Sequence, residues 1–404
     1  MLYISRSLEA VALRASREFP VVIVTGPRQS GKTTLLKHVF GRTHRYVSLE
    51  APDVRASATS DPRSFLDHHA PPVIFDEVQY VPDLLNYIKE TVDRRRSRRG
   101  QYLLTGSQNL LLMDRITESL AGRAAMLRLL PLSRREEFGV PHAAFPWESD
   151  RVRDEREVAS GQLWQHLLRG SYPEIVTDPN RDIALWHSSY IQTYLERDIR
   201  SLRQVGDLTT FQLFLRALAA RHGQLLNLTD VARGVGIAVN TAKAWLSILE
   251  ATFQIVMLRP YFANIGKRLV KTPKLYFTDS GTLCYLVGLR DPLHAASGPM
   301  GGAIFEGAVL SELVKTLLHR GDDPQFYFWR TATGTEVDFL LEQQGKLIPI
   351  EVKLSATPRP EMADGVRAFQ KELPRTASAG YVIHPGSIRL PLGPGVTALP
   401  FGAL

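Results

Sequence analysis

The chain has a single cysteine, Cys284, which excludes an internal disulfide. It also lacks a run of about 20 apolar residues, the length that a membrane-spanning helix needs. Its first residues, Met1 to Arg6, show no apolar segment of the kind that directs secretion. Because disulfides and secretion signals are typical of exported proteins, these absences favour a cytoplasmic protein with no membrane partner. We expect Cys284 to be a buried, unreactive thiol, since its neighbours are apolar.

The chain has 404 residues, enough for two or three domains. Its apolar fraction of 44% and its charged fraction of 22% are those of an ordinary globular protein. The net charge is +8, and a basic excess is compatible with a nucleic-acid partner without identifying one. Composition therefore excludes a disordered or fibrous chain and leaves the partner open.

Short apolar strands alternate with helical segments in the first third of the chain. The run Val21 to Val24 is ended by Gly26 and Pro27, which is typical of a buried strand followed by a turn. Similar runs follow at 46–49, 73–75 and 102–104. Strands that alternate with helices predict a parallel sheet covered on both faces, so we expect an α/β domain.

The segment after the first strand has the pattern G-x-x-x-x-G-K-S/T, from Gly26 to Thr33. Its glycines let backbone N–H groups wrap a phosphate, and the next helix adds its positive end. We expect Lys32 to reach the β and γ phosphates and the Thr33 hydroxyl to bind Mg²⁺. The pattern therefore predicts a P-loop that binds ATP with Mg²⁺. The residues assigned to nucleotide binding are Gly26, Pro27, Arg28, Gln29, Ser30, Gly31, Lys32, Thr33 and Thr34.

Two later strands end in polar residues that complete this prediction. The strand at 73–75 is followed by Asp76, to which we assign the magnesium ion, and by Glu77, to which we assign activation of the attacking water. The strand at 102–104 leads to Ser107, whose hydroxyl we expect beside the γ-phosphate as a catalytic group. Because parallel strands end at one edge of a sheet, these segments predict one catalytic centre.

The chain resembles the AAA-type ATPases of prokaryotes whose C-terminal part is a domain of unknown function. The resemblance rests on segments 25–33, 75–79, 104–108, 119–123, 130–133, 194–198, 336–338 and 350–353. It implies a homo-oligomeric, ring-forming or switch-like ATPase, with a hexamer as one ring size. Rings of this kind complete each ATP site with an arginine from the neighbouring subunit. Arg123 is our first candidate for this arginine, and Arg197 is our second.

The segment 228–249 predicts two helices joined by a glycine turn, which is typical of a helix-turn-helix. We expect Asn240 to cap the second helix. The apolar runs at 253–258 and 274–277 are expected to pair as strands and form the wing of a winged helix. The basic residues predicted to contact DNA phosphates are Lys243, Lys267, Arg268 and Lys271. Winged helices also serve as protein contacts or as lids, and that alternative stays open.

Five arginines stand close together just before the strand at 102–104. They are Arg94, Arg95, Arg96, Arg98 and Arg99. In a ring, such a loop can hold a phosphate backbone. A charged run is also common in a plain solvated loop, so the sequence supports DNA contact here without excluding that interpretation.

The C-terminal part places Glu306 at the start of a predicted helix, Asp338 on a strand, and Glu351 and Lys353 on the next strand. Residues two apart on a strand share one face, so Glu351 and Lys353 are expected to point the same way. Gly345 predicts a hairpin between the two strands. This order resembles the PD-(D/E)xK nuclease fold, which implies a second divalent metal held by the acids. A surface ion pair, or a nuclease fold that only binds, is the alternative.

We therefore predict an α/β protein made of a P-loop AAA-type ATPase core, a helical lid, a winged-helix domain and a C-terminal α/β domain like that of restriction endonucleases. The boundaries are 1–140 for the ATPase core, 141–205 for the linker and lid, 206–295 for the winged helix and 296–404 for the nuclease-like domain.

Three functions are compatible with these parts. The leading hypothesis is an oligomeric Mg-ATP-dependent ATPase that translocates on or remodels single-stranded, forked or branched DNA. The second is an ATP-gated, metal-dependent DNA nuclease. The third is a nucleotide-controlled switch that binds a protein partner. DNA-stimulated ATP turnover favours the first, metal-dependent nicking the second, and a specific protein partner the third.

Overall fold

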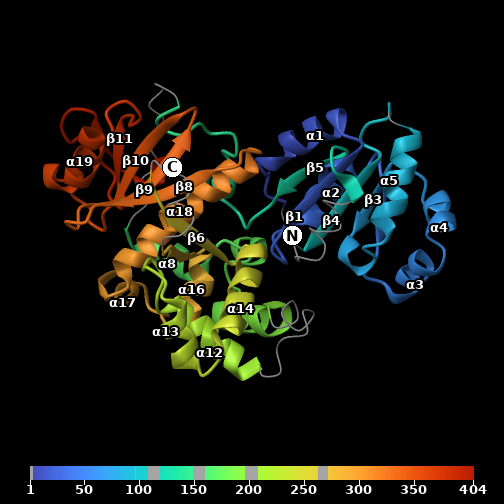
Figure 1. Cartoon of the computed structure of the whole chain (residues 1–404), viewed down its shortest axis with the longest axis horizontal. Coiled ribbons are helices and arrows are strands. Elements are labelled where there is room, and N and C mark those ends of the chain that lie inside the picture. The colour runs from blue at the N-terminus through green and yellow to red at the C-terminus, as the bar shows by residue number, and fades with distance from the viewer. Residues whose placement is uncertain (1–2, 96, 108–118, 149–159, 196–207, 263–271) are drawn as a thin grey trace.

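The structure is a computed structural model that describes residues 3–95, 97–107, 119–148, 160–195, 208–262 and 272–404. In Figure 1 the elements coloured blue to cyan form one end of the molecule, and an orange-to-red sheet forms the other. Green and yellow helices lie below that sheet. The long helix α18 (Gly301–His319) lies between the two ends and contacts strands of both sheets.

The N-terminal part is a parallel sheet of five strands in the order β2-β3-β4-β1-β5. Its strands are β1 (Val21–Gly26), β2 (Arg45–Ser48), β3 (Val73–Asp76), β4 (Tyr102–Ser107) and β5 (Ala124–Arg128). Its helices are α1 (Leu8–Glu18), α2 (Lys32–Phe40), α3 (Pro52–Ser60), α4 (Pro62–His68) and α5 (Leu84–Arg94). The four strands predicted from the sequence are confirmed, and β5 was missed.

Separate apolar clusters cover the two faces of this sheet. Ile23, Phe75 and Leu104 belong to one cluster with α4 and α5, while Val24, Ile74 and Leu103 belong to the other with α1 and α2. Neighbours along a strand point to opposite faces, so a continuous apolar run serves both clusters. This arrangement confirms the predicted α/β sandwich and places all five strand ends at one edge.

A helical part follows the short helix α7 (Arg134–Glu137). It consists of α8 (Ser160–Arg169), α9 (Pro173–Val176), α10 (Ile183–Tyr190), α12 (Leu208–Ala219), α13 (Leu228–Val235), α14 (Val239–Ala251), α16 (Ser280–Leu286) and α17 (Pro292–Ser297). The predicted helix pair is present as α13 and α14, joined at Gly236, which is in the left-handed region. The predicted cap is wrong: Asn240 lies inside α14, whose N-cap is Ala238.

The C-terminal sheet has eight strands in the order β12-β13-β11-β10-β9-β8-β6-β7. They are β6 (Ile255–Pro260), β7 (Lys274–Phe277), β8 (Gln325–Arg330), β9 (Glu336–Gln343), β10 (Lys346–Val352), β11 (Gly380–His384), β12 (Leu390–Pro391) and β13 (Val396–Pro400). Helix α19 (Asp364–Glu372) packs on β9 and β10. The predicted hairpin at Gly345 is confirmed as the antiparallel pair β9-β10.

The predicted wing strands have a different role from the one expected. They pair with each other as β6 and β7, but Arg259 and Pro260 of β6 also pair with β8, so both belong to the edge of the C-terminal sheet. One apolar cluster extends from Leu130 to Leu404 through helices and sheet alike. The boundaries predicted at 205/206 and 295/296 therefore do not separate independent cores.

Within the described ranges, no helix has both the length and the apolar character to cross a membrane. Cys284 is buried in α16, as expected, and burial raises the pKa of its thiol to about 12. At neutral pH this thiol is protonated and shielded, which makes it a poor nucleophile.

The shared core leads to a prediction about truncation. A chain ending at Ser297 loses α18 and the strands that cover Tyr276, Phe277 and Leu283. We expect it to bind the dye 8-anilinonaphthalene-1-sulfonate and to elute as aggregates in size-exclusion chromatography, unlike the full chain. A monodisperse fragment that does not bind the dye would show that the helical part has a core of its own.

Candidate functional site

The predicted phosphate loop lies between the end of β1 and the start of α2, at the edge where the parallel strands end. Gly26 has φ 150° and Gly31 has φ 95°, and Gly31 is the N-cap of α2. A Cβ atom at Gly26 would lie 2.0 Å from the Leu129 carbonyl oxygen, so only glycine fits there. The backbone thus has the shape that a phosphate cradle requires.

The Lys32 ammonium lies inside this loop. Its Nζ donates to the Gly26 carbonyl at 3.1 Å and to the Pro27 carbonyl at 2.8 Å, and the residue is only 5% exposed. These backbone oxygens hold the ammonium at the mouth of the loop. A β or γ phosphate offers the same kind of oxygen ligand with a stronger charge, so Lys32 is placed to exchange one for the other.

The Thr33 hydroxyl donates to Asp76 Oδ1 at 2.6 Å, joining the loop to the end of β3. Asp76 also accepts from Tyr46 at 2.8 Å and from Thr105. A hydroxyl and a carboxylate side by side are ligands that Mg²⁺ accepts together with phosphate oxygens and water. The pair therefore fits the predicted magnesium site. Thr105 lies on β4, within the polar segment that the sequence places at the end of this strand, but its contact with Asp76 was not predicted.

Glu77 follows Asp76 with φ 59°, and its backbone N–H donates to Thr105 at 3.1 Å. Its carboxylate accepts from Gln79. Thr105 therefore fixes the backbone of Glu77, and Gln79 orients its carboxylate. Ser107 ends β4 directly beside Gly26 in the register, which brings the third predicted segment to the same edge. The side chain of Ser107 lies outside the described residues, and its catalytic role stays a prediction.

Arg123 lies at the opposite edge of the sheet, directly before β5, where its carbonyl accepts from Val21 at the start of β1. Its guanidinium makes a two-pronged ion pair with Asp93, at 2.7 and 3.0 Å. Arg123 is therefore absent from the ATP site of its own chain. Its role in a neighbouring subunit stays a prediction, and Arg197 is outside the described residues.

Two cavities flank the phosphate loop. One, of about 110 Å³, touches Gly31 and Thr34 and is lined mainly by apolar groups from the N-terminal segment and α9. Its other lining residues are Tyr3, Ile4, Arg6, Leu132, Pro173 and Thr177. The second, of about 330 Å³, touches Gln29 and is lined by α10 and the segment before it, including Arg181 and Trp186. The loop is therefore flanked by one apolar cavity and one cavity with a mixed polar and apolar lining.

The arginine run lies at the edge opposite the phosphate loop, between α5 and β4. Arg94, Arg95, Arg98 and Arg99 are exposed, and Arg96 is outside the described residues. Arg94 pairs with Glu90 at 2.5 Å. Lys243 is exposed on α14, whereas Lys267, Arg268 and Lys271 fall outside the described residues. The structure thus tests the placement of the arginine loop but not that of the predicted wing contacts.

The four C-terminal residues predicted as a nuclease-like site lie close together. Asp338 Oδ2 accepts from the Val352 N–H at 2.8 Å, and Lys353 donates to Glu351 at 2.6 Å. Burial and the neighbouring Asp338 raise the pKa of Glu306 to about 7 and that of Glu351 to about 8. Such mutual effects require short separations between the carboxyl groups.

Lys274 of β7 was not predicted, and it changes the chemistry of this cluster. Its ammonium lies 3.6 Å from Glu306 and is also paired with Glu336, while Tyr276 donates to Glu306. Across the described part of the chain, no group of three or more His, Cys, Asp or Glu side chains has the arrangement of a metal site. Lys274 therefore compensates only part of the negative charge of this cluster, and the predicted second metal has no support among the described residues.

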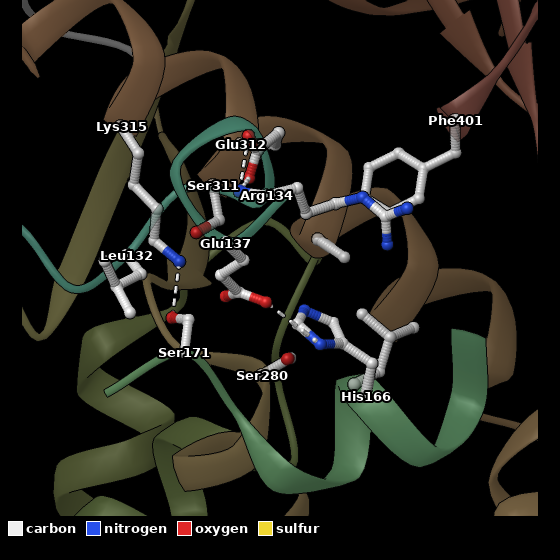
Figure 2. Close-up of a pocket in the computed structure, with 12 residues that line it drawn as sticks. Leu132, Arg134, Glu137, His166, Ser171, Ser280, Ser311, Glu312, Lys315 and Phe401 are labelled. Carbon is white, nitrogen blue, oxygen red and sulfur yellow. Dashed lines mark hydrogen bonds and ion pairs between the residues drawn. The ribbon is translucent and has the colours of Figure 1, made fainter. Parts of the chain in front are cut away.

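A further polar pocket lies between α7, α8, Ser171, α16 and α18 (Figure 2). Its volume is about 20 Å³, room for one or two water molecules. Figure 2 shows the Glu137 carboxyl pointing at His166, and the oxygen and nitrogen are 3.4 Å apart. Lys315 donates to Ser171 at 2.6 Å on the opposite wall. No sequence motif predicted this pocket, because its residues come from five separate segments.

Three family models match the chain in succession. Residues 18–138 match an AAA domain, residues 160–293 a domain of unknown function (DUF8612), and residues 301–404 a second domain of unknown function (DUF4143). The first match covers the sheet that carries the phosphate loop. The last two divide the chain near the predicted boundary at 295, although the structure joins both segments in one core.

Similar proteins extend over nearly the whole chain. The uncharacterised proteins Rv2008c of Mycobacterium tuberculosis and Mb2031c of Mycobacterium bovis are each 34% identical over 402 residues, which is 99% of this chain and 84% of theirs. An uncharacterised protein of Haemophilus influenzae is 21% identical over 356 residues, 82% of each chain.

Solved structures give weaker likenesses. The Walker-type ATPase PABY2304 of Pyrococcus abyssi matches with a TM-score of 0.46 and 18% identity, over 70% of this chain and 96% of that one. RuvB of Thermotoga maritima matches with a TM-score of 0.29 and 16% identity, over 62% and 86%.

The pocket of Figure 2 leads to a prediction about pH. Burial raises the pKa of Glu137 from 4.5 to about 8, so the folded chain binds a proton there that the unfolded chain releases. Stability from this group is complete below pH 4.5 and is lost as the pH rises toward 8, by about 1.4 kcal/mol per unit. The charged and titratable groups that face it are Arg134, Glu136, His166, Glu312 and Lys315.

Replacing Glu137 by Gln keeps a neutral side chain and removes this titration. In urea unfolding, we expect the variant to gain stability relative to wild type as the pH rises from 5 to 8. The exposed Glu372→Gln variant, as a control, should follow wild type. Parallel curves for Glu137→Gln and wild type would mean that Glu137 is ionised in the folded chain.

Proposed function

The chain belongs to the family of the mycobacterial proteins Rv2008c and Mb2031c, and we propose that it is a magnesium-dependent ATPase that acts on DNA. Its N-terminal part is an AAA domain with a P-loop at the ends of parallel strands. The observation that carries the proposal is the 2.6 Å contact between the Thr33 hydroxyl and Asp76. Chain segments far apart in sequence meet there as a pair of magnesium ligands.

The roles of the site residues follow from their positions. Lys32 would exchange its carbonyl partners for phosphate oxygens, and Thr33 and Asp76 would hold Mg²⁺, which would supply positive charge to neutralise the phosphates. Glu77, one residue beyond Asp76 and oriented by Gln79, accepts a proton from the attacking water. Ser107 completes the set as a polar group beside the γ-phosphate.

The apolar cavity next to Gly31 and Thr34 suits a nucleobase. It lies on the α2 side of the loop, so a nucleotide with its phosphates on the loop can place its base there. Pro173 and Thr177 of the helical part form one wall, and Tyr3 and Ile4 of the N-terminal segment form another. A base in this cavity would contact both parts of the chain, which gives the helical part the position of a lid.

The edge opposite the ATP site supports DNA as the partner. All five strands start there, and exposed arginines precede or begin three of them. These are Arg17 before β1, Arg42 and Arg45 at β2, and Arg94, Arg95, Arg98 and Arg99 before β4. Asp93, an acid beside the loop, is already paired with Arg123.

The dimensions of this edge suit a phosphate backbone. Five strands about 4.8 Å apart span about 19 Å, and duplex DNA carries one charge per about 1.7 Å of its axis. The spacing of the arginines along this edge is thus of the same order as the spacing of the phosphate charges along DNA. This supports DNA binding at the ATPase part itself, with ATP turnover driving movement or remodelling of forked, branched or single-stranded DNA by a ring of identical subunits.

Two other functions remain as rivals. An ATP-gated nuclease would use Glu306, Asp338, Glu351 and Lys353. A buried Glu351 oxygen that has no hydrogen-bond partner among the described groups favours it. The position of Lys274 weighs against it. A switch that binds a protein partner would need no DNA contact. Steady-state ATPase assays with single-stranded, duplex and forked DNA across a salt series separate the leading function from the protein switch, because the switch expects no salt-sensitive stimulation. Metal-dependent nicking that is lost in Asp338→Ala would select the nuclease.

The ATP site can be tested by two substitutions with different expected effects. Lys32→Ala removes the phosphate ligand, so binding of Mg-ATP should fall below detection in calorimetry. Glu77→Gln keeps the cradle and removes the base, so binding should persist while kcat falls by about 10²- to 10⁴-fold. The exposed Glu361→Gln variant is the control and should match wild type. Near-normal turnover in Lys32→Ala would refute the assignment.

The arginine edge can be tested through the salt dependence of DNA binding. Replacing Arg42, Arg45 and Arg98 by Ala should lower the slope of log K against log salt by about 2 to 3, since each phosphate contact contributes about 0.9. A triple variant of Arg359, Arg375 and Arg389 loses the same charge at exposed C-terminal positions. Equal slopes in the two triple variants would assign binding to net charge and not to this edge.

A further inference from the structure

A buried arginine from the N-terminal segment, Arg6, forms a hydrogen bond with the backbone of the phosphate loop. Arg6 is 3% exposed, and its Nη1 donates to the Ser30 carbonyl at 2.9 Å. Its Nη2 donates to the Leu130 carbonyl at 2.7 Å, and its Nε lies 3.1 Å from Glu136 Oε2. One guanidinium therefore joins the loop, the segment after β5 and the carboxylate of α7.

The hydrogen bond from Arg6 to the Ser30 carbonyl sets the direction of the Gly31 N–H, which is the group expected to bind phosphate. A trans peptide is planar, so the Ser30 carbonyl and the Gly31 N–H point in opposite directions. Because Arg6 holds that carbonyl on the side away from the phosphate cradle, the Gly31 N–H points toward the cradle. Gly31 has a positive φ and no side chain, so its own conformation does little to fix the plane of the peptide between Ser30 and Gly31.

Glu136 is the central acceptor of this cluster. It is 1% exposed and accepts from the Ser7 N–H and the Ser133 N–H, both at 2.9 Å. Burial alone would raise the pKa of Glu136, but Arg6 and His319 outweigh it and hold that pKa well below its usual range. Glu136 is therefore an anion, paired with the Arg6 cation in the interior.

His319 carries the connection into the C-terminal part. Its Nδ1 lies 3.1 Å from Glu136 Oε1, and its Nε2 accepts from the Leu130 N–H at 3.0 Å. Because Nε2 accepts, the ring proton is on Nδ1, the nitrogen that lies beside the carboxylate. His319 is the last residue of α18, the helix that also carries Glu306, about 20 Å away along its axis.

A second contact ties the same helix to the same segment. The backbone N–H of Arg134, at the start of α7, donates to both carboxylate oxygens of Glu312 on α18, at 2.9 and 3.0 Å. Helix α18 is thus held by the segment 130–136 at two points, roughly two turns apart. A shift of this segment cannot leave α18 unaffected, because packed interiors move as units.

We propose that Arg6 is a positioning residue of the phosphate loop, and that Glu136 and His319 couple the geometry of that loop to α18 and the C-terminal sheet. The proposal rests on the proposed function, since it assumes that nucleotide binds the loop. Coupling is reciprocal: an α18 held in place favours nucleotide binding, and bound nucleotide holds α18 more firmly. Couplings of this kind change affinity by about 5- to 150-fold.

A purely structural role for the ion pair predicts something different. The cluster would then stabilise the fold, and its removal would lower the melting temperature without changing the affinity of the folded protein for nucleotide. The distinguishing readout is therefore nucleotide affinity measured well below the melting temperature, together with a measurement on α18 itself.

The first experiment compares variants of the full chain in binding N-methylanthraniloyl-ATP with Mg²⁺. His319→Ala should weaken affinity at least five-fold, and His319→Gln should recover most of it, because an amide can accept from Leu130 and donate to Glu136. The control is His384→Ala. His384 is equally buried in β11 but bonds only locally, to Ile388 and Gly386. Equal affinity for His319→Ala and wild type would overturn the proposal.

The second experiment needs no variant to fold. In hydrogen exchange on the wild-type chain, peptides from 130–138 and 308–320 should gain protection when Mg²⁺ and a non-hydrolysable ATP analogue are added. Unchanged exchange in 308–320, with protection in the loop itself, would overturn the coupling and leave the ATP site intact. Absence of nucleotide binding in wild type would instead refute the proposed function.

Discussion

The buried ion pair between Arg6 and Glu136 is the contact on which the arrangement of the molecule depends. It holds the phosphate loop, the segment after β5 and α18 at one point in the interior. A paired charge of this kind is stable only while both partners are present, and loss of one typically costs about 3–5 kcal/mol. The pair therefore constrains the ATPase sheet and the C-terminal core to one relative placement.

Lysine ammonium groups lie in two places where the sequence predicts a bound group: a nucleotide phosphate in the loop and a divalent metal in the C-terminal cluster. In the phosphate loop, Lys32 rests on backbone carbonyls that a nucleotide phosphate would replace. In the C-terminal cluster, Lys274 lies against Glu306 and Glu336. The first lysine is poised for exchange because its carbonyl partners are neutral. The second is paired with carboxylates in the interior, where separation of charges is costly.

Sequence patterns predicted a strand or loop correctly where the residues that form it are neighbours in the chain. The strands at β1, β3 and β4, the glycine loop and the acid after β3 follow from runs of neighbouring residues. Pairing between distant segments was not predicted: β6 and β7 pair with each other as expected, but β6 also pairs with β8, which follows much later in the chain. Arg123 lies directly before β5, at the edge away from the phosphates of its own chain, and its role in a neighbouring subunit stays a prediction.

The sequence by itself determined the α/β sheet, the phosphate loop after its first strand and the acid that follows β3, because strand period, glycine spacing and the order of parallel strands are encoded in short segments. Only the tertiary structure decided that Arg6, Glu136 and His319 meet, that Lys274 pairs with Glu306 and Glu336, and that the helical and C-terminal parts share one core. These contacts join residues tens to hundreds of positions apart, and burial, which sets their charges, exists only after the chain has folded.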